Sequence, residues 1–232
     1  MDEPITLSVA QLRALDAFAA SELGLPSCVL MENAGANAAR ELLSTLRAQV
    51  FAGIRRPGPW RIAVLCGRGG NGGDGYVLAR HVRNAGHEVT LLSAAPRAAL
   101  GGDTALFRNT CERMGLATVD PDDGHAVEAF LAQLSSCDAI VDALLGAGAV
   151  GAPRAPLDGW LQRANAASGP LKVALDLPSG IEADSGARHG EAFRAELTLS
   201  FAARKLAFDH AGLAPWLGRV RVLDIGVSAR RA

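Results

Sequence analysis

Apolar residues recur at helical spacing over the first fifty positions of the chain. Ser8 and Gln11 have the spacing of a helix-capping box and are followed by an apolar stripe, which predicts a first helix. Met31 and Ala34 begin a second stripe with the same spacing. Both segments precede the first strand-like run. We therefore expect residues 1–50 to form a helical extension that packs on the rest of the protein.

From Trp60 onward, short apolar runs alternate with helical segments. Strands are expected at residues 60–66, 87–93, 138–146, 171–180, 195–202 and 219–227, with a weak one at 116–119. Helices are expected at residues 72–86, 104–115, 126–137 and 156–166. This alternation predicts an α/β fold in three layers, with a mostly parallel central sheet between helices. A chain of 232 residues suits a single domain, residues 1–232.

Charge and composition exclude several classes of function. The formal net charge is -1, so no broad basic field favours nucleic acid. No uncharged apolar run approaches the ~20 residues of a membrane span. The four cysteines lie far apart and form no CxxC pair, which argues against a zinc or redox motif and favours the cytoplasm.

A glycine-rich loop follows the first predicted strand and opens a helix. Gly67, Gly69 and Gly72 have the G-x-G-x-x-G spacing of a dinucleotide-binding turn. An ordinary NAD(P)-dependent oxidoreductase would need an acid near Ser93 to hold the ribose, and none is present. Asn71 and Asp74 add oxygen ligands that a plain phosphate cradle does not need. The alternative is a purely structural turn in which only glycine fits.

Two carboxylates stand at the ends of predicted parallel strands. Asp142 ends one strand and Asp176 ends another, so both are expected in the crevice that the glycine loop lines. Oxygen groups of Asn71, Asp142 and Ser179 could converge there on a hard cation. Either Asp142 or Asp176 could serve as a general acid or base. The alternative is that both acids cap the helices that follow them.

Motifs along nearly the whole chain resemble those of the NAD(P)H-hydrate epimerases, including the N-terminal module of bifunctional hydrate-repair proteins. The matching segments are LMENAG, GGNGGDGYVLARHV, IVDALLGAG, ALDLPSGI, TLSFAARK and VRVLDIGV. The resemblance implies a Rossmann-like fold and the interconversion of R and S forms of hydrated NADH and NADPH (NADHX and NADPHX) at nicotinamide C6. It also implies a cytoplasmic metabolite-repair isomerase, a homodimer and a bound potassium ion. A separate NAD(P)HX dehydratase would then be its metabolic partner.

The same resemblance assigns roles to individual positions. Potassium ligands are expected at Asn71, Asp142 and Ser179. Substrate contacts are expected at Gly70, Asn71, Gly72, Gly73, Asp74, Gly146, Ala147, Gly148, Ala149, Val150, Gly151, Ala152 and Asp176. The sequence departs from the family pattern in two places. Gly70 stands where the family usually has a first asparagine. Lys205 matches the family, but the turn that follows it is altered.

The main alternative to an epimerase is a non-catalytic nucleotide-binding or scaffold module, because folds are often reused without their chemistry. A scaffold has no need of the whole set of Asn71, Asp74, Asp142, Asp176 and Ser179. The sequence leaves open the preference between NADHX and NADPHX, the identity of the cation and the choice of acid or base.

Overall fold

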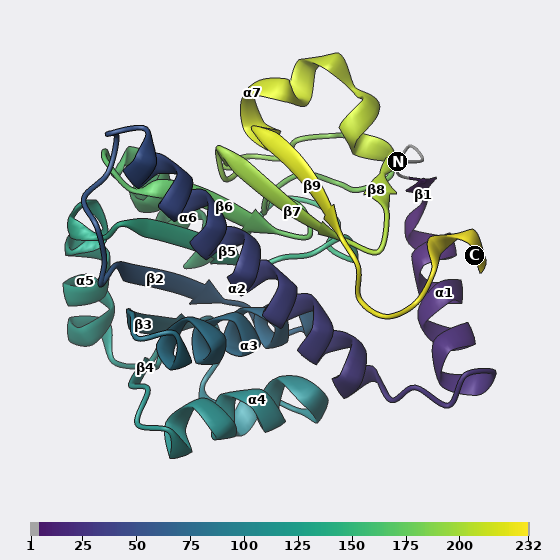
Figure 1. Cartoon of the computed structure of the whole chain (residues 1–232), viewed down its shortest axis with the longest axis horizontal. Helices are drawn as coiled ribbons and strands as arrows, with labels where there is room; N and C mark the ends of the chain where they lie inside the picture. The colour runs from purple at the N-terminus through teal and green to yellow at the C-terminus, as the bar shows by residue number, and fades with distance from the viewer. Residues whose placement is uncertain (1–4, 232) are drawn as a thin grey trace.

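A computed structural model describes residues 5–231. Within those residues, seven strands form one central sheet with helices on both faces (Figure 1). From edge to edge the strands are β4 (Thr118–Val119), β3 (Glu88–Ser93), β2 (Arg61–Cys66), β5 (Ala139–Ala143), β6 (Leu171–Leu175), β7 (Leu197–Phe201) and β9 (Arg219–Leu223). Every neighbouring pair is parallel. The predicted three-layer α/β fold is confirmed.

Successive side chains of the central strands point to opposite faces of the sheet and pack into two separate hydrophobic cores. Ile62 and Val64 of β2 pack in the larger core, and Ala63 and Leu65 pack in the other. The helices that fill the larger core are α2 (Ser27–Phe51), α3 (Gly70–Asn84) and α4 (Gly102–Arg113). Those that fill the other are α5 (Gly124–Ala132) and α6 (Leu157–Ala166). Burial of the sheet on both faces explains why its strands read as continuous apolar runs.

The N-terminal segment is built into the domain and does not hang from it. Helix α1 (Val9–Ser21) begins at the predicted capping box, with Ser8 and Gln11 bonded reciprocally. Its Leu15 and Ala19 are buried in the larger core. Strand β1 (Thr6–Leu7) pairs in parallel with β8 (Arg204–Lys205), which ties the segment to the far end of the chain. Figure 1 shows α1 beside the sheet, near the C-terminal segment.

The connection from β6 to β7 differs from the alternating pattern, because residues 176–196 cross over without a helix. Pro178 and three glycines at positive φ (Gly180, Gly186 and Gly190) prevent a regular helix there. Helix α5 also ends earlier than expected, at Ala132, and a separate 3-10 turn follows it. The short helix α7 (Ala214–Leu217) leads into β9.

The strand order places a switch point at the centre of the sheet. From β2 the chain proceeds outward through β3 to β4 at one edge of the sheet. It then returns to the other side of β2, where the remaining strands follow in the order β5, β6, β7 and β9. The loops that leave β2 and β5 therefore diverge at their carboxyl ends and open a crevice between them. This is the part of the molecule that the sequence identifies as the candidate site.

Candidate active site

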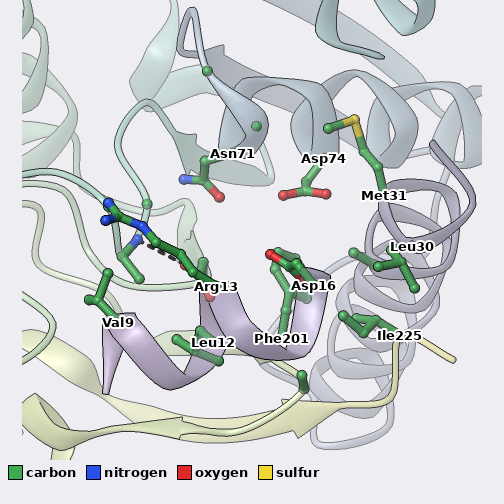
Figure 2. Close-up of a pocket in the computed structure, with 18 of the residues that line it drawn as sticks. Val9, Leu12, Arg13, Asp16, Leu30, Met31, Asn71, Asp74, Phe201 and Ile225 are labelled. Carbon is green, nitrogen blue, oxygen red and sulfur yellow. Dashed lines mark hydrogen bonds between the residues drawn. The ribbon is translucent and has the colours of Figure 1, made fainter. Parts of the chain in front are cut away.

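A cavity of about 620 Å³ lies at the carboxyl ends of β2, β5, β6 and β7. Its walls are residues 68–71 and Asp74 after β2, residues 144–149 after β5, Asp176 after β6, and residues from 201 to 205 after β7. Helix α1 and the start of α2 close the other side (Figure 2). The glycine loop, the second glycine-containing loop and one of the two predicted carboxylates thus share one chamber.

Glycines of the first loop serve two different purposes. A Cβ on Gly67 would lie 1.8 Å from the carbonyl oxygen of Leu144, and one on Gly72 would lie 1.8 Å from that of Gly67. Gly67 is needed so that the loops after β2 and β5 can touch, and Gly72 is needed so that the first turn of α3 can pack on the backbone of Gly67. Gly69 and Gly70 instead have almost no neighbours and line the cavity. Helix α3 begins there, so its free N–H groups favour an anion.

Asn71 has an unused oxygen. Its Nδ2 donates to the carbonyl of Leu145 at 3.0 Å, but its buried Oδ1 has no hydrogen-bond partner among the described residues. Buried polar atoms are nearly always paired, so a carbonyl-type oxygen left over beside a cavity indicates a ligand. A cation or a donor group of a substrate would satisfy it.

Asp142 is not among the residues that line the cavity, and its side chain is fully buried. One carboxyl oxygen accepts from the Ser179 hydroxyl at 2.7 Å and from the Leu144 amide at 3.1 Å, and the other accepts from the Ser179 amide at 2.8 Å. Burial raises the pKa of this carboxyl to about 6, although the Ser179 bonds oppose the shift. Asp142 therefore fixes the loops after β5 and β6, and it does not face the cavity.

Asp176 faces the cavity and holds its wall in place. Its backbone adopts a left-handed conformation, with φ 64, which few residues other than glycine accept. One carboxyl oxygen pairs with Lys205 Nζ at 2.5 Å, and the other accepts from the amide of Ala147 at 2.9 Å. Lys205 is 1% exposed and also donates to Ser200 Oγ at 3.0 Å. An acid, a buried cation and the loop after β5 thus form one unit.

Asp74 lies in the first turns of α3 with its carboxyl group turned into the cavity (Figure 2). Burial raises the pKa of this carboxyl well above its ordinary value, and the charge of Asp176 raises it further. No described residue donates a hydrogen bond to it or forms an ion pair with it. Asp74 is thus available to a ligand.

The predicted site residues separate into two sets. Those that line the cavity are Gly70, Asn71, Asp74, Gly146, Ala147, Gly148, Ala149 and Asp176. Those that do not are Gly72, Gly73, Asp142, Val150, Gly151, Ala152 and Ser179. Among the second set, Gly73 leaves room for the Met31 side chain and Val150 is 86% exposed to solvent.

Sequence reasoning did not identify the wall that α1 contributes. Arg13 and Asp16 of this helix line the cavity, and Figure 2 shows both side chains among the residues that surround it. A signal was present: Asp16 is four residues after Leu12 and next to Leu15, so a carboxylate lies beside the apolar stripe of an otherwise ordinary amphipathic helix. The sequence indicates only that Lys205 matches the family pattern, whereas the structure shows it as the buried partner of Asp176.

Comparison with known proteins identifies the relatives of this chain. Residues 27–207 match the family model described as YjeF-related protein N-terminus. The chain is 38% identical over 221 residues to the NAD(P)H-hydrate epimerase of Rhodopirellula baltica, which covers 95% of this chain and 84% of that protein. It is 36% identical to the epimerase of Pirellula staleyi, over 93% of this chain and 89% of the relative.

Longer relatives contain the same region. The bifunctional NAD(P)H-hydrate repair enzyme Nnr of Moorella thermoacetica is 36% identical over 95% of this chain, and the match covers 40% of that protein. The crystal structure of yeast ynu0 has the same fold, with a TM-score of 0.74 and 21% identity over 88% of this chain and 83% of that one. The chain belongs to the YjeF-related N-terminal family, to which the NAD(P)H-hydrate epimerases belong.

Proposed function

We propose that this protein is an NAD(P)H-hydrate epimerase, an isomerase that interconverts the R and S forms of NADHX and NADPHX. The observation that carries the proposal is the meeting of the glycine loop, Asn71, Asp74 and Asp176 around one cavity in a chain similar to epimerases over 95% of its length. A non-catalytic module would not require free carboxyl groups in such a chamber.

Charge in the cavity indicates how a dinucleotide would lie. The free N–H groups at the start of α3 and the side chains of Arg13 and Arg68 suit the diphosphate. The carboxyl groups of Asp74 and Asp176 line the same cavity and suit a group that exchanges protons. We therefore place the hydrated nicotinamide ring near Asp74 and Asp176.

Inversion at C6 needs proton transfer whether the hydroxyl leaves and returns or the ring opens and closes. Of the two acids that the sequence nominates, Asp176 lines the cavity and Asp142 does not. Asp176 is thus the better candidate for contact with substrate, and its ion pair with Lys205 holds the carboxyl group in place. Asp142 supports the reaction by positioning Ser179 and the loop after β5.

The three residues predicted to bind potassium offer the oxygen atoms that such an ion prefers. Asn71 Oδ1 is an unpaired buried oxygen, and Asp142 supplies a buried anionic carboxylate next to the Ser179 hydroxyl. Hard cations prefer such all-oxygen donor sets. When bound, the ion would stiffen the two loops and offset negative charge of the diphosphate. Potassium is then expected to raise the melting temperature of the wild type, and Asn71→Ala is expected to remove most of that increase.

A homodimer and a separate dehydratase partner complete the proposal, together with a cytoplasmic location. Among residues 5–231, no helix has the length and apolar character that crossing a bilayer requires. All four cysteines are free, which suits a reducing compartment. Light scattering on the purified protein would test the dimer, with a monomer mass as the contradicting result.

The deciding experiment follows purified R-NADHX in potassium buffer by chromatography. The enzyme is expected to form S-NADHX far faster than a no-protein control, and Asp176→Asn is expected to slow it by about 100-fold or more. Asp122→Asn, an exposed acid distant from the cavity wall, is the matched control and should leave the rate unchanged. A wild-type rate equal to the control would favour the binding-module alternative. Incubation with NAD and alcohols tests the oxidoreductase alternative.

A further inference from the structure

Two carboxyl groups of the cavity have no assigned partner. Asp16 of α1 and Asp74 of α3 lie on opposite sides of the chamber, and Figure 2 shows both carboxyl groups turned into it. Within residues 5–231 neither side chain forms a hydrogen bond or an ion pair, whereas Asp176 is engaged by Lys205 and Ala147. The free acids therefore come from opposite walls, one of them outside the segment that the family model matches.

Both acids stand on rigid elements. Helix α1 is fixed by its capping box, by the bond from the Val9 amide to Asp184 Oδ1 at 2.8 Å, and by buried Leu15. Helix α3 is pressed against α2, since a Cβ on Gly35 would lie 2.7 Å from the carbonyl oxygen of Asp74. Opposed groups on fixed helices can act on a ligand held between them without a loop having to close.

Electrostatics favours a proton on this pair. The charged groups that line the cavity are Arg13, Asp16, Arg68, Asp74, Asp176 and Lys205. Partial burial and then the charge of Asp176 raise the pKa of the Asp16 carboxyl, and the charge of Asp16 adds to the rise at Asp74. Lys205 opposes both shifts but is already paired with Asp176. Repulsion between like-charged carboxyls in one chamber disfavours ionisation of all of them at once.

Building on the proposed function, we propose that Asp16 and Asp74 are an opposed acid–base pair that inverts C6 by removing its hydroxyl from one face and adding water to the other. The protonated carboxyl gives its proton to the hydroxyl. The C6–O bond breaks, water departs, and the lone pair of the ring nitrogen forms a double bond to C6. Water then adds to the opposite face, the nitrogen recovers its lone pair, and the second carboxylate takes the proton.

This pathway needs no oxidant or reductant, and one turnover moves a single proton from one acid to the other. The pair is then set for the reverse direction, or returns to its first state by exchange with solvent. Two acids on one wall could not act on both faces of the ring. Helix α1 thus contributes the acid, Asp16, that acts on the second face of the substrate ring.

The test uses Asp16→Asn, with Glu22→Gln as the matched control because Glu22 is an exposed acid at the end of the same helix. Asp16→Asn is expected to lower kcat by about 100-fold, to leave KM within about threefold, and to remove one ionisation from the pH profile. Glu22→Gln is expected to match the wild type. Because Asp16 has no bonded partner, Asp16→Asn should keep the wild-type melting temperature; if the amide destabilises the helix, Asp16→Ala gives the same test.

Labelled water supplies a second measurement. In oxygen-18 water, S-NADHX formed by the enzyme is expected to carry the label at C6, after subtraction of the spontaneous reaction. Unlabelled S-NADHX, or full activity and an unchanged pH profile in folded Asp16→Asn, would overturn the acid–base pair. Failure of the wild type to epimerise at all would instead overturn the proposed function, so the two outcomes are distinct.

Discussion

Replacement of Lys205 by methionine tests the unit that joins the cavity wall to the sheet. Methionine keeps much of the length and apolar volume of the side chain but removes its charge and its three donors. In the native protein Lys205 is 1% exposed, pairs with Asp176 at 2.5 Å, and donates to Ser200 Oγ and to the Phe201 carbonyl at 3.1 Å. Lys205→Met thus leaves the Asp176 carboxylate without its cation.

The magnitude follows from that burial. Removing one partner of a buried ion pair costs about 3–5 kcal/mol in free energy of unfolding. Asp176 retains 16% exposure to the cavity, where water can solvate it, so the lower end of about 3 kcal/mol applies. Lys172→Met is the matched control, because Lys172 Nζ makes one hydrogen bond, to the Ala167 carbonyl at 2.7 Å. Its loss should cost about 1 kcal/mol.

Urea unfolding of the single and double variants measures the pair directly. If the ion pair is the source of the loss, Asp176→Asn combined with Lys205→Met should cost about 1–3 kcal/mol less than the sum of the single changes. The midpoint should shift with an unchanged m value, since the surface exposed on unfolding stays the same. Additivity within about 0.3 kcal/mol would refute the reasoning and leave Lys205 as a packing residue.

Two further predictions concern stability. Gly67→Ala places a Cβ 1.8 Å from the Leu144 carbonyl oxygen and should lower the melting temperature by more than about 5 °C. The control is Gly124→Ala, where a Cβ has no atom within 4 Å, and it should shift the melting temperature by less than about 2 °C. Equal melting temperatures would contradict the close approach at Gly67. Burial lowers the pKa of His87, which stacks on Trp60. At His87 the unfolded chain therefore binds protons more readily than the folded one, and the stability that His87 contributes should be lost as pH falls through its ordinary pKa of 6.5. Urea unfolding of wild type and His87→Phe at about pH 8 and pH 5.5 tests this. The same pH dependence in both proteins would contradict it.

Local sequence pattern was sufficient for most of the sheet. Continuous apolar runs such as residues 62–66 are typical of parallel strands covered on both faces, and these residues are buried in the structure. Pattern was insufficient where strands are only two residues long, as in β1 and β8. The pairing of β1 with β8 brings together segments that lie far apart in the sequence, and a strand of two residues is too short to show the alternation of apolar and polar side chains.

Prediction of the candidate site was limited for a different reason. The acids at the strand ends could be located because parallel topology brings those ends together. The orientation of the two side chains could not be predicted. Asp142 is buried against Ser179 and does not line the cavity, whereas Asp176 lines it and has a left-handed backbone. Asp16 was missed since a helix that precedes the sheet has no fixed place until it is packed, and only the structure shows which loop ends it covers.

The position of α1 has a consequence for how relatives are compared. The region matched by the family model begins at residue 27, six residues after α1 ends at Ser21. A protein trimmed to that region would lose the edge strand β9 but keep the other six strands and the glycine loop, while its chamber stood open on the side that α1 covers. Membership of the family and completeness of the chamber are thus separate properties, and the second is read from the residues that precede the match.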